Sequence, residues 1–481
     1  MFKMEKFKNT LNSLTHDLFS DKKSLFLPPS KNEETISTTF KAQAFHGESD
    51  QLIELVDKML ENIDLTNPPG VAGKICTELE LYEHRALAEL RPLVALSCLS
   101  MVNHRRESFG GGNLNFQCLG IALTATAKEA HLSFTKKVMA GVGLGAKISS
   151  KPRSDLDILI EPIDKEFMLY AFDEVHSFFQ QATGKNAASF ESGMVSYLLE
   201  LCTSERFYFP NKTRMNLEAK YNSIVDSLED KERLTVKQQS QLGKAKRILD
   251  RLENGWEDPF LSLTGYSTPI NMDIMINKHN IEQGLIARFI ILRAPTKRTK
   301  MTWRKIKGPS SELLSILTEI LESDQKITID AEAHSSLNYV FNYFELDVHL
   351  NHPQLGAIYA RGTKWVMLIA SLLASKDNII THEHIAYATK LFMYNINTCK
   401  QVLNNESDLE EALLLKAKEQ VLRYTDNKSI GRGELASKMS NCCSQIRHYK
   451  KKKKDICHVL IDRLIEDGVL IQEGSLLFQP S

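Results

Sequence analysis

The sequence has no long hydrophobic run. No apolar stretch approaches the roughly 20 residues that a helix needs to cross a bilayer. Residues 1–23 mix lysine, aspartate and asparagine with scattered phenylalanine and leucine, so they lack the apolar centre of a signal peptide. These two absences argue against a membrane protein and against a secreted one. We therefore expect a cytoplasmic chain with no membrane partner.

The chain also lacks net charge and lacks cysteines spaced as metal ligands. Its 60 basic residues balance its 60 acidic residues, so any case for nucleic-acid binding must rest on a local patch. The eight cysteines include no pair with metal-ligand spacing. Cys442 and Cys443 are adjacent, which suits neither a zinc knuckle nor an easy disulfide. Free thiols in a reducing compartment are the expectation.

The length of 481 residues predicts two to four domains, and the local patterns divide the chain. A polar, irregular lead-in precedes a helical region, and a core of alternating strands and helices follows. A second helical region and a small C-terminal part complete the chain. The predicted boundaries are 1–48 for the lead-in, 49–105 for the first helices, 106–296 for the core, 297–404 for an α-helical lid or bundle, and 405–481 for the C-terminal domain.

Apolar runs in the core predict an α/β fold with a parallel sheet, because strands that alternate with helices pair through crossovers. The predicted strands are 114–123, 158–160, 167–172, 260–269 and a last one ending near residue 293. Residues 211–256 differ from the rest of the core. They are highly charged, contain no proline, and keep only a thin apolar stripe. They predict an inserted antiparallel helical hairpin, which is either a solvated protrusion or an arm for a partner or DNA.

The segment Thr124-Ala125-Thr126-Ala127-Lys128-Glu129 lies between a predicted strand and a predicted helix. A phosphate-binding loop uses glycines for close backbone approach, a lysine for the β/γ-phosphates, and a hydroxyl for Mg²⁺. With the lysine at Lys128, the glycine positions fall on Ala122 and Ala127, and the hydroxyl position falls on Glu129. What persists is a small-residue loop, a lysine and a helix N-terminus that favours anions. Thr124, Thr126 and Lys128 are the candidate nucleotide-binding residues here, and a plain strand-to-helix turn is the alternative.

Two further strands end in polar residues. Asp173 and Glu174 directly follow the apolar run 167–172. In a nucleotide site Asp173 would hold Mg²⁺ through water, and Glu174 would activate the attacking water. Thr264 and Thr268 lie where a third strand would present a hydroxyl to the γ-phosphate. Each of these features is also compatible with an ordinary polar strand end.

Two arginines outside these strand ends are candidates for contacts with nucleotide. Arg288 follows a turn that begins with glycine, and it could reach the site of a neighbouring subunit as a catalytic residue in trans. Arg361 lies on a predicted helix of the second helical region, where it could close on bound nucleotide. The structural alternatives are a surface arginine beside a strand and an arginine that caps a neighbouring helix.

The clearest local charge lies near the C-terminus. Helices followed by two short strands predict the winged helix-turn-helix order. Within this unit lies a basic cluster that suggests contacts with the DNA backbone, although lysines alone bind phosphates without reading sequence. A solvated basic turn is the alternative. The candidate DNA-binding residues are Arg447, Lys450, Lys451, Lys452, Lys453 and Lys454.

Taken in order, these motifs resemble the primase–helicase-like proteins of phages, plasmids and prophages, a domain-of-unknown-function family with a helicase-type P-loop core of AAA+ or RecA-like kind. The resemblance covers roughly residues 70–400. It rests on the loop 124–129, on Phe172-Asp173-Glu174, and on an arginine at 361 that precedes an apolar helix. It also rests on the runs 261–269 (LSLTGYSTP) and 284–289 (GLIARF). The alanines at 125 and 127 depart from the family's glycine-rich loop.

The resemblance implies a DNA-dependent ATPase or helicase-like replication protein of a mobile genetic element. It further implies ATP and Mg²⁺ as ligands, and a homo-oligomer such as a hexameric ring that acts with replication partner proteins. The missing glycines leave an alternative open: a catalytically inactive DNA-binding initiator, loader or structural subunit built on a decayed P-loop fold. Whether the chain is an enzyme is therefore not decided by its sequence.

Overall fold

A parallel sheet of five strands organises the described structure, in the order β2-β3-β6-β1-β7. The computed structural model describes residues 49–183, 189–229, 231, 233–276, 278–295, 297–425, 429–442, 446 and 455–479. The predicted α/β class with a parallel sheet is confirmed, whereas the predicted lead-in at 1–48 lies outside the described residues. The strands are β1 (Gln117–Ile121), β2 (Ile148–Ser149), β3 (Phe167–Phe172), β6 (Phe260–Ser267) and β7 (Ile290–Arg293).

The sheet is buried on both of its faces. Every residue of β1 and β6 is buried, and successive strand residues point to opposite faces. Parallel sheets covered in this way read as continuous apolar runs in the sequence, which is why these strands were recognisable. The covering helices are α4 (Arg91–Val102), α7 (Val175–Thr183) and α8 (Ser189–Thr203) against β6, and α6 (Asp155–Lys165) against β3.

The predicted strand at 158–160 is wrong, because these residues belong to helix α6. The hydroxyl of Ser154 caps this helix by accepting the backbone N–H of Asp157 at 3.1 Å. Ile158, Leu159 and Ile163 are buried at helical spacing, whereas Ile160 and Glu161 are half-buried. The short run of three apolar residues therefore reflects one face of a helix. The edge strand is instead β2.

The first helical region packs onto the sheet. It comprises α2 (Ser49–Leu60), α3 (Gly70–Tyr82), the 3₁₀ turn η1 (Ala88–Leu90) and α4. Helix α4 is buried along its whole length and contacts β1, β6 and α5 (Lys128–Gly141). After α5 comes the 3₁₀ turn η2 (Gly145–Lys147). Helix α5, which follows the candidate loop, therefore packs against α4.

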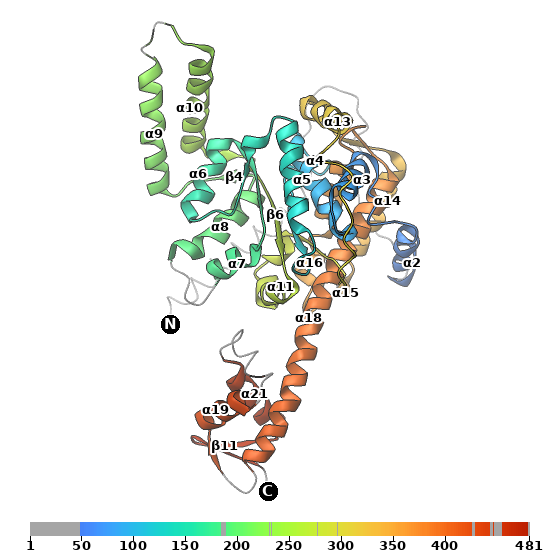
Figure 1. The fold of residues 1–481 in the computed structure, drawn as a ribbon, viewed down its shortest axis with the longest axis vertical. Coiled ribbons are helices and arrows are strands. Elements are labelled where there is room, and N and C mark those ends of the chain that lie inside the picture. Colours follow the sequence, from blue (N-terminus) through green and yellow to red (C-terminus); the bar gives the residue numbers. More distant parts are fainter. Residues whose placement is uncertain are drawn as a thin grey trace, which may run out of the picture. The chain divides into compact units, whose positions relative to one another are not determined.

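The predicted hairpin insertion is confirmed. Helices α9 (Asn211–Glu229) and α10 (Val236–Asn254) lie antiparallel and side by side (Figure 1). Thr235 and Gln238 form a capping box at the start of α10. The short antiparallel strands β4 (Arg206–Phe207) and β5 (Trp256–Glu257) close the base of the insertion.

The chain beyond β6 is mostly helical. No helix in the described ranges combines the length and the apolarity needed to cross a membrane. The predicted domain boundary between residues 404 and 405 falls inside α18, a single helix of 43 residues. The elements are α11 (Pro269–Met275), α12 (Lys278–Glu282), η3 (Ile286–Arg288), α13 (Ser311–Glu322), β8 (Thr328–Ile329), α14 (Ala331–Phe344), α15 (Asp347–Leu350), α16 (Gly356–Tyr359), α17 (Gly362–Leu373), β9 (Ile379–Ile380) and α18 (His382–Tyr424).

The C-terminal residues form a small unit with its own apolar cluster, which includes Val421 of α18. A three-stranded antiparallel sheet has the order β10-β12-β11. The predicted basic cluster of Arg447, Lys450, Lys451, Lys452, Lys453 and Lys454 lies outside the described residues. The elements are β10 (Ile430–Gly431), α19 (Arg432–Cys442), α21 (Ile456–Glu466), β11 (Ile471–Glu473) and β12 (Leu476–Phe478).

A buried polar network fixes α5 to its neighbours. The Glu83 carboxylate accepts two hydrogen bonds from the Arg91 guanidinium, at 3.0 and 2.6 Å, and lies 2.9 Å from His131 Nε2 on α5. His131 Nδ1 lies 3.3 Å from the Tyr266 hydroxyl on β6. Burial favours a raised pKa for Glu83, but the hydrogen bonds and charges of His131 and Arg91 outweigh it and lower the pKa.

We predict that Glu83→Gln destabilises the protein by about 3–5 kcal/mol at pH 7, because the Arg91 charge is left buried without its partner. The matched control is Glu80→Gln, which removes the other, mostly exposed partner of Arg91 and should cost under about 1 kcal/mol. Because the Glu83 pKa is lower in the folded state, its stabilisation is complete above the unfolded carboxyl value of about 4.3 and is lost as the pH falls through the folded value. Urea unfolding at several pH values measures both effects. Equal losses for the two variants at pH 7 would contradict this account.

Candidate functional site

The carboxyl ends of three neighbouring strands bring the sequence-predicted loop and acidic residues to one edge of the sheet. In the register, Ile121 of β1 pairs with Ser267 of β6, and Phe172 of β3 pairs with Gly265 of β6. The loop after β1, the pair Asp173–Glu174 after β3, and Thr268 after β6 therefore share this edge. Ligands of open α/β sheets bind outside the carboxyl ends of the strands, so this is where a site is expected.

The loop between β1 and α5 has an unusual backbone. Ala125 and Ala127 have φ of 61° and 71°, in the left-handed region that glycine favours, and the residues between and beside them do not. A left-handed conformation costs an L-residue about 1–2 kcal/mol. Alternation of this kind forms the backbone concavity that binds anions in phosphate loops. The Cβ of alanine disfavours this conformation, yet both alanines adopt it.

Two side chains hold the loop in place. The Thr126 hydroxyl donates a hydrogen bond to the Leu123 carbonyl at 2.6 Å, and Thr126 is buried. The Arg298 guanidinium donates to the Thr124 carbonyl at 3.0 Å. Of the two threonines predicted to contact nucleotide, Thr126 uses its hydroxyl within the loop, and Thr124 is exposed. Arg298 was missed by sequence reasoning, since 174 residues separate it from Thr124 and no local pattern joins them.

Lys128 is a buried cation whose ion pair with Asp173 is the one seen for it among the described residues. Its side chain is 7% exposed, and its ammonium nitrogen lies 3.6 Å from Asp173 Oδ1. That carboxylate oxygen also accepts the backbone N–H of Glu174 at 2.9 Å. A buried ammonium needs hydrogen-bonding or charged partners, and a single ion pair at this distance supplies little of either. The geometry leaves Lys128, at the first turn of α5, able to accept a further anion.

Glu174 is exposed and has φ of 56°, so the chain turns sharply after β3. Its carbonyl accepts hydrogen bonds from the backbone N–H of Ser177 at 2.9 Å and from the Ser177 hydroxyl at 2.8 Å. These bonds fix the turn while the Glu174 carboxylate faces solvent. The Lys151 ammonium donates to the Ser177 hydroxyl at 2.9 Å. Burial lowers the pKa of Lys151, and the negative charge of Glu174 partly opposes this shift.

His176 and Ser267 are a second pair that sequence reasoning missed. The Ser267 hydroxyl lies 2.8 Å from His176 Nδ1 at the end of β6. Burial lowers the pKa of His176, the charge of Glu174 opposes the shift, and the charge of Lys128 adds to it. The imidazole is therefore neutral at pH 7. Histidine two residues beyond a D-E pair is a weak signal in sequence, because the partner serine lies 91 residues away.

The two threonines predicted to contact the γ-phosphate lie in different environments in the structure. Thr264 does not lie at the strand end. It pairs with Cys118 in the register, is fully buried, and its hydroxyl lies 2.6 Å from the hydroxyl of Ser97 on α4. That expectation is corrected because the strand continues for three more residues. Thr268 is half-buried at the strand end and precedes α11 without capping it.

Arg288 and Arg361, the two arginines predicted to contact nucleotide, lie near each other and away from Lys128. Arg288 precedes β7, whose first residue pairs with Cys118, so it lies at the amino end of the sheet, opposite the loop. Its guanidinium donates to the Gly284 carbonyl at 2.8 Å. Burial and the positive charge of Arg288 lower the pKa of Arg361, which places the two arginines near each other. An Arg361 that closes over nucleotide bound at Lys128 of the same chain is therefore not seen.

The described residues contain no group of three His, Cys, Asp or Glu side chains arranged to hold a metal ion. Mg²⁺ commonly takes one or two carboxylates and completes its shell with waters and phosphate oxygens. Asp173 and the exposed Glu174 fit that smaller requirement. Asp173 is half-buried, next to Lys128.

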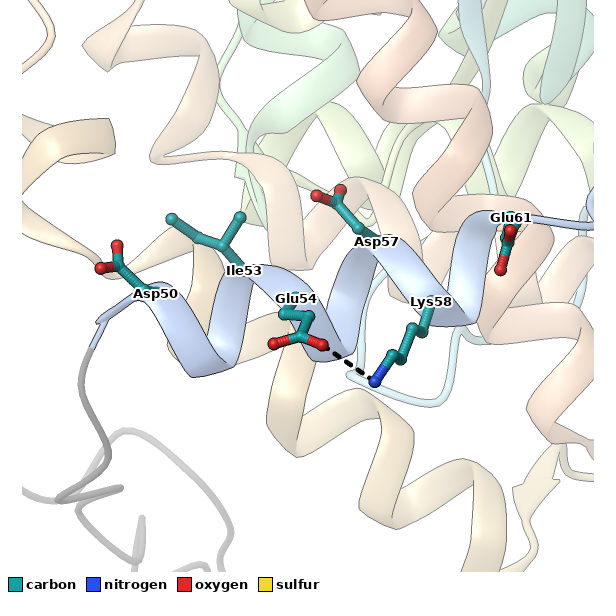
Figure 2. A pocket seen from close by; sticks show the side chains of 6 residues that line it. All are labelled: Asp50, Ile53, Glu54, Asp57, Lys58 and Glu61. Carbon is teal, nitrogen blue, oxygen red and sulfur yellow. Dashed lines mark ion pairs between the residues drawn. The ribbon is translucent and has the colours of Figure 1, made fainter.

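A wide-open hollow lies elsewhere, on the outer face of α2. Figure 2 shows that the side chains lining it come from α2 and from Glu61 in the turn directly after it. Glu54 and Lys58 form an ion pair, with their charged atoms 2.9 Å apart. The hollow has no wall from a second element and includes none of the residues at the sheet edge. The lining residues are Asp50, Ile53, Glu54, Asp57, Lys58 and Glu61.

Comparisons with known proteins do not add to this geometry. No protein-family model matches the chain, and no curated protein matches it significantly.

We predict that Ala125→Gly stabilises the protein by about 0.5–1 kcal/mol, because relief of the left-handed strain exceeds the added entropy of glycine in the unfolded chain. Ala127→Gly should gain less, since the buried methyl of Ala127 is lost as well. The control is Ala130→Gly, in the first turn of α5, which should destabilise by about 1 kcal/mol. Urea unfolding measures all three. If Ala125→Gly lowered the free energy of unfolding as much as Ala130→Gly does, Ala125 would not have a left-handed backbone in solution.

Proposed function

We propose that the chain binds a nucleoside triphosphate at the loop 123–128 and hydrolyses it as a P-loop ATPase. The observation that supports this most is the left-handed backbone at Ala125 and Ala127, directly before a buried Lys128. Together these supply three parts of a phosphate site: a concave backbone, which the sequence pattern did not predict, a helix N-terminus and a buried cation.

The chemistry assigned to each residue follows from its position. Lys128 and the N-terminus of α5 would hold the phosphates, and Asp173 would hold Mg²⁺. The metal, when bound, neutralises charge on the phosphates. Glu174 orients the attacking water and accepts its proton, and the exposure of its side chain suits that role. Ser267, fixed by a neutral His176, replaces Thr264 as the hydroxyl directed at the terminal phosphate.

The wider function that we propose is that of a DNA-dependent, helicase-like replication protein of a mobile genetic element. The order of the motifs along the chain supports it, as does a C-terminal unit whose helices and three-stranded sheet are compatible with a winged helix. In this proposal Lys450 to Lys454 contact DNA, and subunits assemble as a ring. The placement of Arg288 at the sheet edge opposite its own loop is compatible with action on a neighbouring subunit.

A non-catalytic role is the second candidate, and one observation favours it. Glu129 occupies the position of the Mg²⁺-binding hydroxyl in the phosphate-loop pattern, so the loop lacks one metal contact. An initiator, loader or structural subunit would keep the fold, and it could keep nucleotide binding, without turnover.

ATP hydrolysis with and without single-stranded DNA separates the two candidates. We predict that Glu174→Gln lowers the hydrolysis rate a hundredfold or more while nucleotide still binds, because only the proton acceptor is lost. Lys128→Ala should abolish both binding and hydrolysis. Lys136→Ala, an exposed lysine on the same helix, is the control and should hydrolyse ATP at the wild-type rate. A wild-type rate no higher than that of Glu174→Gln would leave only the non-catalytic candidate.

A further inference from the structure

The segment from Lys297 to Lys307 is a basic, exposed stretch beside the loop at Thr124. It contains six basic residues and no acidic residue. None of the six forms an ion pair among the residues that the structure describes. All six are exposed. The six are Lys297, Arg298, Lys300, Arg304, Lys305 and Lys307.

The backbone of segment 297–307 is anchored although it forms no helix or strand. The N–H groups of Thr302 and Lys305 donate to the carbonyls of His84 and Leu81, each at 2.8 Å. Arg85 donates to the Thr299 carbonyl at 2.5 Å. The Arg304 guanidinium lies 4.7 Å from the centre of the Tyr82 ring. The backbone is therefore held against residues 81–86, while most of the side chains are left to solvent.

Trp303 lies in the middle of this segment and is 89% exposed, and Met301 beside it is 59% exposed. A large aromatic side chain this exposed leaves most of its apolar surface in water, which is unfavourable unless a partner covers it. The chain has three tryptophans, and the other two, Trp256 and Trp365, are buried. The exposure of Trp303 is therefore an exception within this protein.

We propose that segment 297–307 binds single-stranded nucleic acid, with its cations on the phosphates and Trp303 stacked on an unpaired base. Surfaces of this kind combine a positive track for the backbone with aromatic platforms that accept any base. A protein partner fits less well, because lysine is depleted at protein–protein interfaces. A duplex fits less well, because its bases are already stacked on each other and leave no face for Trp303.

This proposal does not involve the C-terminal lysines, Lys450 to Lys454. Arg298 contacts the Thr124 carbonyl, so a strand bound here would touch the loop that holds the phosphates in the proposed function. That link to hydrolysis rests on the proposed function, but binding of the strand does not. The test is therefore made without nucleotide, so that failure of one proposal is distinguishable from failure of the other.

The experiment titrates the full chain with a 20-nucleotide oligothymidylate, following tryptophan fluorescence and the anisotropy of a labelled copy. We expect quenching that is lost in Trp303→Ala, with about tenfold weaker binding. The triple variant Lys300→Gln, Arg304→Gln and Lys305→Gln should bind at least tenfold more weakly. Its slope of log K against log salt should be shallower by about 2, since each single-strand phosphate contact contributes about 0.7.

The matched control removes three exposed basic residues at the tip of the α9–α10 hairpin, and should bind like wild type. The substitutions are Lys231→Gln and Arg233→Gln in the turn and Lys237→Gln at the start of α10. An abasic oligonucleotide should bind without quenching. Quenching should persist when Lys450 to Lys454 are neutralised. Wild-type binding by both Trp303→Ala and the triple variant would overturn the proposal. It would equally be overturned if polyglutamate competed as well as the oligonucleotide, because an acidic protein would then be the better partner.

Discussion

The backbone between Leu123 and Lys128 is the constraint on which the candidate site depends. Two alanines hold left-handed φ values there, and the direction in which α5 leaves the sheet follows from them. That direction places Lys128 in a buried position next to Asp173. The strain is local and unfavourable, so contacts around the loop must maintain it. The Thr126 hydroxyl and the Arg298 guanidinium both bind carbonyls of the loop, which is the form such contacts take.

A buried polar network also fixes the position of α5. Glu83, Arg91, His131 and Tyr266 connect α3, α4, α5 and β6 through buried hydrogen bonds. Breaking such a network is unfavourable because each member would be left with a buried, unpaired polar group. The loop is thus held at both ends, by β1 in the sheet and by this network under the helix. A phosphate site needs its donors positioned before the ligand arrives, and this arrangement provides that.

Sequence reasoning recovered the parts of the fold that are local. The apolar run 167–172 followed by Asp173 and Glu174, the strand before the loop, and the charged hairpin were all readable from periodicity and composition. The three residues 158–160 were misread, because a run that short does not distinguish a strand from the buried face of a helix. Thr264 was misplaced because the sequence did not show which polar residue of the run 260–269 lies at the strand end and which is buried inside the sheet. The roles of His176, Ser267 and Arg298 depend on contacts between distant segments, which no local pattern contains.

Binding of nucleotide through its phosphates is the central claim, and calorimetric titration tests it directly. The wild-type chain is titrated with ATP and Mg²⁺, with ADP and Mg²⁺, and with adenosine, and Lys128→Ala is titrated in parallel. The account predicts that the wild type binds ATP and ADP, that adenosine binds far more weakly, and that Lys128→Ala binds none of them measurably. Absence of ATP binding by the wild type, or equal binding by Lys128→Ala, would contradict it.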